Sequence, residues 1–216
     1  MRSRLIGGVL AATTAAVLAA GCSDSSNAPA AGTPTPTPPA SAAAPVSPEH
    51  NAADVVFAQG MLPHHTQAIA MSAEASTRAA SQEVKDLAAR IDQEQGPEIE
   101  QMNQMLDAWG APRPQPGSTS MPGMPGMPGM PGMPTSAMPM PGMMSEAQMQ
   151  QLASRSGPAF DRMFLQMMIE HHTGAVQMAQ TEQAQGLNPQ AKELAAAIVA
   201  DQQREITEMQ NLLTRV

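Results

Sequence analysis

The chain contains one sequence pattern twice, and this duplication limits the possible folds more than any other feature. Residues 54–106 align with residues 161–213 without a gap, at a constant offset of 107 positions. Identical residues at matched positions include Asp54 and Asp161, Phe57 and Phe164, Met61 and Met168, His64 and His171, His65 and His172, Met71 and Met178, Ile91 and Ile198, Glu98 and Glu205, and Met102 and Met209. Self-similarity at one fixed spacing indicates the duplication of a single structural unit.

Each unit has the start and stop signals of helices. A proline follows a possible N-cap at Ser47–Pro48 and again at Asn188–Pro189, which predicts a helix start at both places. Gly110 predicts the end of a helix in the first unit, because glycine readily adopts the left-handed conformation of a C-terminal cap. We therefore expect two helices in each unit.

The two units should fold together as one bundle. The chain has only 3 Phe, 1 Trp and no Tyr, so its core must use aliphatic residues and methionine, which suit helices better than sheets. A hairpin of two amphipathic helices cannot cover its own apolar stripe, whereas two hairpins can cover each other. We predict an all-α fold, a four-helix bundle made of duplicated hairpins at residues 47–109 and 145–216.

The N-terminus has the features of an export signal. Arg2 and Arg4 precede an apolar run that is too short to span a membrane, which predicts a signal peptide at residues 1–21. Cys22, the only cysteine, follows in LAAGC, which resembles a bacterial lipoprotein processing site. We expect lipidation of Cys22 and a disordered Ser/Ala/Thr/Pro tether at residues 22–46; plain secretion is the alternative. The net charge of −8 disfavours nucleic acid as a partner.

A linker rich in Met, Pro and Gly separates the units at residues 110–144 and holds nine of the twenty methionines. Thioethers are soft ligands, so this segment could capture Cu(I) through a high effective concentration. The alternatives are a Pro-Gly spacer in which methionine is incidental, or a sink for oxidants. Ser145 and Gln148 fit a capping box, which predicts a short helix before the second unit.

The paired histidines lie on helices whose apolar stripes can be traced. Successive residues of a helix are about 100° apart, so neighbouring histidines face different directions. His64 falls within the stripe that contains Phe57, Met61 and Met71, whereas His65 lies at its edge. The second unit repeats this arrangement with Phe164, Met168, His171, Met178 and, at the edge, His172. We therefore expect His64 and His171 to face the interior.

The second helix of each unit places an acid on its apolar stripe, Glu98 in one unit and Glu205 in the other. A buried carboxylate is costly unless it is paired or bound to a metal, so we expect His64–Glu98 and His171–Glu205 pairs. One interpretation is that these pairs only fix the register of the helices. Pro63 and Pro97 occur in the first unit alone and predict kinks there, so the two halves need not be equivalent.

A second interpretation is metal binding inside the bundle. Imidazole and thioether ligands together favour copper, and Cu(I) more than Cu(II), over hard ions. A di-iron oxidase is disfavoured because that chemistry needs a Glu-x-x-His step, and Met61 and Met168 stand where those glutamates would be. The candidate metal ligands or orienting residues are His64, His65, His171, His172, Met61, Met71, Met168, Met178, Glu98 and Glu205.

Two motifs carry a resemblance to a known family. F-x-x-x-M-x-x-H-H-x-x-A-x-x-M spans residues 57–71 and 164–178, and L-A-x-x-I-x-x-x-Q-x-x-E-I-x-x-M spans 87–102 and 194–209. Both copies resemble the domain of unknown function 305 family of bacterial secreted proteins. The resemblance implies a ferritin-like bundle outside the cytoplasm, and some members of the family are linked to copper binding and tolerance.

Residues and resemblance together predict an extracytoplasmic, lipid-anchored protein that binds a metal ion, copper above all. It would sequester the ion or pass it on, with no catalytic residues assigned and with its protein partner unknown. The alternative is a structural or interaction lipoprotein whose His–Glu pairs only build the core.

Overall fold

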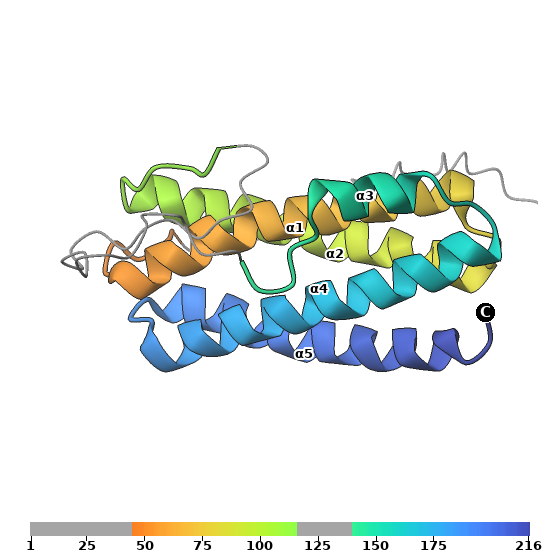
Figure 1. Cartoon of the computed structure of the whole chain (residues 1–216). Helices are drawn as coiled ribbons and strands as arrows, with labels where there is room; N and C mark the ends of the chain where they lie inside the picture. Colours follow the sequence, from red (N-terminus) through yellow and green to blue (C-terminus); the bar gives the residue numbers. More distant parts are fainter. Residues whose placement is uncertain (1–44, 116–139) are drawn as a thin grey trace, which may run out of the picture. The chain divides into compact units, whose positions relative to one another are not determined.

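The computed structural model describes residues 45–115 and 140–216, and all its regular elements are helices (Figure 1). The prediction of an all-α fold is confirmed, since no strand occurs in the described residues. The signal peptide, Cys22, almost all of the tether and most of the methionine-rich linker lie outside this part of the chain. The helices are α1 (Ala52–Arg78), α2 (Gln82–Ala108), α3 (Glu146–Ala153), α4 (Pro158–Gln185) and α5 (Pro189–Leu213).

The four long helices form two packed hairpins. Helix α1 packs along α2, α4 packs along α5, and the hairpins meet chiefly where α1 contacts α4. The short α3 lies against α1 and α4, as Figure 1 shows. No helix among the described residues is both long and apolar enough to cross a membrane.

The predicted helix starts are partly confirmed. Asn188 caps α5 by accepting hydrogen bonds from the backbone of Gln190 and Ala191, and Ser145 forms the expected capping box with Gln148 at α3. The prediction of Ser47 as the cap of the first helix is wrong, because α1 is capped by Asn51.

Ser47 has a different role because its backbone is used in tertiary contacts. Its N–H donates to the Gln190 side chain, and its carbonyl accepts from the side chains of Trp109 and Asn188. These bonds fasten the extended segment before α1 to the start of α5. The helix therefore begins only where Asn51 and Asp54 can form a reciprocal capping box.

The ends and interruptions of the helices agree with simple backbone rules. Gly110, which follows the C-cap residue Trp109 of α2, has a φ of 63°, in the left-handed region that favours glycine. Pro63 and Pro97 lie inside α1 and α2, and both helices continue through them.

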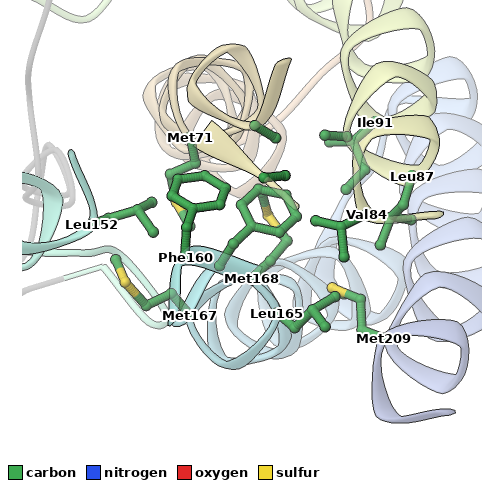
Figure 2. Close-up of a cluster of buried hydrophobic side chains, with 14 of the residues drawn as sticks. Met71, Val84, Leu87, Ile91, Leu152, Phe160, Leu165, Met167, Met168 and Met209 are labelled. Atoms are coloured by element: carbon green, nitrogen blue, oxygen red, sulfur yellow. The ribbon is translucent and has the colours of Figure 1, made fainter. Parts of the chain in front are cut away.

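The apolar core consists of two clusters at different heights along the bundle. One cluster takes its α1 residues from Ala68 onward and its α4 residues up to Met168; Figure 2 shows part of it, including Phe160, Leu165 and Met209. The other takes its α1 residues up to Leu62 and its α4 residues from Ala175 onward. All four paired histidines fall in the layer between the two clusters.

Candidate metal centre

Helices α1 and α4 bring His64 and His171 together in the centre of the bundle. The ring centroids are 3.8 Å apart and the ring planes are tilted by 46°. The prediction that these two residues face the interior is confirmed, since both are 0% exposed. His65 and His172, which the helical stripe placed at its edge, are buried just as completely.

The two remaining histidines form the His–Glu pairs. His65 Nε2 lies 2.7 Å from Glu98 Oε2, and His172 Nε2 lies 2.7 Å from Glu205 Oε2. The predicted His64–Glu98 and His171–Glu205 pairs are therefore wrong.

The helical rotation explains this exchange of partners. The His64 ring meets a ring of α4, and a step of about 100° along α1 turns the next side chain toward α2. Glu205 is buried as expected, whereas Glu98 is only half-buried. Each pair joins the two helices of one hairpin, while the His64–His171 contact joins the hairpins.

Burial keeps the central histidines neutral. It lowers the pKa of His64 to about 3, an effect strengthened by the nearby His65 and His172 and opposed by a hydrogen bond to Pro141. Burial also lowers the pKa of His171 well below its ordinary value of 6.5, with a further contribution from His64. Both rings are therefore uncharged at neutral pH, the form in which imidazole binds a metal ion.

The ring nitrogens of the cluster are unevenly satisfied. Carbonyl and carboxylate oxygens accept hydrogen bonds, so Nε2 of His64, His65 and His172 carries the proton that is donated to them. In the part of the chain that the structure describes, Nδ1 of all four paired histidines is buried without a hydrogen-bond partner, and Nε2 of His171 also lacks one. The centre thus contains several buried nitrogens that are free to coordinate.

These histidines do not by themselves form a site built only from nitrogen and oxygen. In the described part of the chain, no three His, Cys, Asp or Glu side chains converge on a common point that could hold a metal ion. A site here would therefore have fewer than three such ligands or would include another kind of ligand, such as a thioether. Met61 and Met168 are 0% exposed, and each precedes a central histidine by three residues on the same helix face.

The other two predicted methionines lie about two helical turns beyond the central histidines, on the same helices. Met71 and Met178 are buried and follow His64 and His171 by seven residues. Met71 packs in the cluster of Figure 2, and Met178 packs in the other cluster. They therefore line the two apolar layers that enclose the histidines.

A short segment at the end of the predicted linker covers part of the centre. Residues 140–144, here called the strap, lie against α1 and α4. His64 Nε2 donates to the carbonyl of Pro141 at 3.0 Å. The Gln67 side chain donates to the Met144 carbonyl at 2.8 Å and accepts from the Met144 N–H at 2.7 Å.

Two further buried side chains were not predicted as part of the site. Gln95 and Gln202 are each 3% exposed, and neither amide group has a hydrogen-bond partner among the residues described. They precede Glu98 and Glu205 by three residues, so they share a helix face with the His–Glu pairs. The sequence signal that could have identified them is that both copies of the duplication have glutamine at this position.

Comparisons with other proteins agree with this architecture. Residues 54–213 match the family described as Domain of unknown function (DUF305). A DUF305 protein from Streptomyces coelicolor is 34% identical, with a TM-score of 0.65, over 76% of this chain and 93% of that one. A DUF305 fragment from Deinococcus radiodurans is 32% identical, with a TM-score of 0.62, over 80% of this chain and 100% of that one.

A third similar protein, CopM, has been solved in several metal-bound forms. Its Cu(I)-bound form is 28% identical to this chain, with a TM-score of 0.57, over 75% of this chain and 96% of that one. Structures of CopM are also known in Cu(II)-bound, Ag-bound and apo forms. No curated protein sequence matches this chain significantly.

Proposed function

Because the chain belongs to the Domain of unknown function (DUF305) family, we propose that it binds copper, chiefly as Cu(I), in the layer between its two apolar clusters. His64 and His171 are the central ligands, and thioethers complete the site. The protein holds the ion or passes it on, and it does not transform a substrate. The metal-bound forms of the similar protein CopM support this choice of metal.

The observation that carries the proposal is the state of the His64–His171 pair. Burying a polar group without a hydrogen bond costs free energy, yet His171 is buried and neither of its ring nitrogens has a partner among the described residues. If these rings only filled the core, an apolar side chain would serve at lower cost. Neutral, unpartnered nitrogens are, in contrast, what a metal ion requires.

The nature of the surrounding ligands favours Cu(I). Methionine sulfur is a soft ligand that does not need to lose a proton, and soft ligands select Cu(I) over hard cations. Cu(I) also accepts low coordination numbers, which suits a layer where no three His, Cys, Asp or Glu side chains of the described residues converge. Met61 and Met168 are the nearest candidates along the chain, with Met71 and Met178 next.

The His–Glu pairs have a supporting role in this proposal. A carboxylate that accepts from one ring nitrogen orients the ring and makes the other nitrogen a better ligand. Glu98 and Glu205 hold His65 and His172 in this way. The free Nδ1 of each ring then faces a buried environment and can act as an outer ligand.

We further propose that the protein works outside the cytoplasm, anchored by a lipid on Cys22. The proposal rests on the signal-like residues 1–21 and the LAAGC sequence around the cysteine. The methionine-rich linker would capture Cu(I) and deliver it to the bundle.

Competition against a chromophoric Cu(I) chelator tests the central site. The test uses the full chain after signal removal, with residues 118–138 deleted so that the six linker methionines before the strap region (residues 140–144) do not contribute. We expect this protein to bind Cu(I), and the double variant His64→Ala/His171→Ala to lose the tight site. His50→Ala is the matched control, because His50 stacks on Trp109 away from the central layer.

The alternative function is structural, with the His–Glu pairs serving only the core. Binding to the folded state raises the thermal midpoint as free Cu(I) increases, whereas a purely structural pair gives no such dependence. If the double variant binds Cu(I) as tightly as His50→Ala, the ion is not held by the central histidines and the proposed site is wrong.

A further inference from the structure

The strap breaks the symmetry of the duplicated bundle at its centre. Position 67 in the first unit matches position 174 in the second, and each follows a central histidine by three residues. Gln67 stands at one position and Gly174 at the other. The strap contacts both, so it crosses α1 and α4 at equivalent heights, beside the His64–His171 pair.

The docking of the strap on α1 and α4 depends on the difference between these two residues. On α1, Gln67 holds the Met144 backbone through two hydrogen bonds. On α4, a Cβ atom at position 174 would lie 2.1 Å from the Pro141 carbonyl oxygen, so only glycine permits the contact. Helix α1 thus holds the strap by hydrogen bonds, and α4 leaves space for the strap backbone.

The backbone of the strap has a conformation that lets it approach α4 closely. Gly142 has a φ of 76°, and a Cβ atom there would lie 2.7 Å from the His171 carbonyl oxygen. Met140 and Met144, at the two ends of the strap, are buried, with 2% and 1% of their surface exposed. Backbone conformation, side-chain burial and hydrogen bonds therefore all specify the same position.

The docked strap gives the two central histidines different surroundings. The Pro141 carbonyl accepts from His64 Nε2, so the proton of this neutral ring is fixed on Nε2 and the lone pair is left on Nδ1. Within residues 45–115 and 140–216, His171 has no equivalent partner at either nitrogen. One ring is held in a single tautomer and orientation, and the other is not.

We propose that the strap is a positioning element of the metal site, which fixes the His64 tautomer so that Nδ1 is the atom presented to Cu(I). This inference rests on the proposed function, since it assigns a role within the same site. A backbone carbonyl that accepts from the distal nitrogen of a metal-binding imidazole orients the ring and selects the ligand atom. The strap supplies that carbonyl from outside the duplicated helices.

Two substitutions release the strap by different routes. Gln67→Ala removes both hydrogen bonds to Met144 and leaves the α4 surface unchanged. Gly174→Ala blocks Pro141 sterically, and alanine is intrinsically better than glycine inside a helix, so the helix itself is not weakened. Gln177→Ala, on the exposed face of α4, is the matched control, and far-ultraviolet circular dichroism checks that every variant folds.

The first readout uses the metal-free full chain with ¹⁵N-labelled histidine. In wild type and Gln177→Ala, we expect His64 to give the resonance pattern of a pure Nε2–H tautomer, with a ring proton protected from exchange. In Gln67→Ala and Gly174→Ala, we expect a mixture of tautomers and a loss of that protection. A merely structural strap would change stability without altering the tautomer.

The second readout is Cu(I) affinity, measured by competition in the same four proteins with residues 118–138 deleted, as in the test of the central site. Loss of a group that orients a metal-binding histidine typically weakens binding by about 10–100-fold, so we expect at least a tenfold loss in both strap variants. A wild-type tautomer in both strap variants, or an unchanged affinity when the tautomer is lost, would overturn the role of the strap. Absence of Cu(I) binding in wild type would instead overturn the proposed function, whatever the tautomer shows.

Discussion

Glu182 should make the stability of the bundle depend on pH in a way that one substitution removes. It is 1% exposed near the end of α4, and burial together with the adjacent Asp54 carboxyl raises its pKa to about 8. Burial also acts on Asp54, but hydrogen bonds from Glu182 and from the backbone of Asn51, Asn188 and Leu187 lower its pKa overall. At neutral pH, Asp54 is therefore ionised and Glu182 is protonated.

The sign of the effect follows from the protons bound in each state. Between an unfolded pKa of 4.5 and a folded pKa of about 8, the unfolded chain releases its proton while the folded chain keeps it. Stability from this group is fully present below pH 4.5 and falls as pH rises, by about 1.4 kcal/mol per pH unit. From about pH 5.5 to about pH 7 the loss is about 2 kcal/mol.

The assay is chemical denaturation of wild type and Glu182→Gln at several pH values. The amide is neutral and similar in shape, so the variant should gain about 2 kcal/mol on wild type between about pH 5.5 and about pH 7. His64 and His171 titrate in both proteins, and their effect cancels in the difference. Glu193→Gln, on the exposed surface of α5, should show no such gain. Parallel stability curves for wild type and Glu182→Gln would refute the reasoning.

Two further predictions concern single carboxylates. Asp161 accepts from the backbone N–H groups of Ala80 and Ser81, so Asp161→Ala should lower the unfolding free energy by about 2 kcal/mol; urea denaturation measures it, and a loss near zero would mean that water replaces both bonds. Glu205→Gln should keep the fold but weaken Cu(I) binding about tenfold, because His172 loses its charged partner; chelator competition measures it, and an unchanged affinity would remove His172 from the site.

The fold could be predicted from the sequence because its signals are local. The duplication defined the two units, and three- and four-residue spacing placed His64 and His171 on the buried face. The second inference uses only residues within one helix, whose geometry is fixed by the backbone, and the first needs only the comparison of the chain with itself. The caps at Ser145 and Asn188 were predictable for the same reason.

The wrong predictions all concern contacts between segments. Pairing Glu98 with His64 required the rotation of α1 about its axis relative to α2, which a single helix pattern does not contain. Ser47 has the sequence of a cap, but its backbone bonds to Trp109 and Asn188 lie far along the chain. Tertiary contacts overrode a local preference in both cases.

The positions at which the two repeats differ can make the two halves of the bundle unequal, which the identical positions cannot do. Identical residues such as the four histidines build a frame in which both halves are equivalent, and an equivalent frame cannot distinguish one central ring from the other. The difference between Gln67 and Gly174 distinguishes the two rings. The Gln67 side chain forms a hydrogen bond to the strap, and the absence of a side chain at Gly174 leaves room for the strap. The Pro141 carbonyl of this single segment accepts from His64 Nε2, and in the described part of the chain no strap carbonyl accepts from His171. The asymmetry at His64 is therefore a consequence of placing one strap on a duplicated bundle, and it follows from physical constraint at two residues.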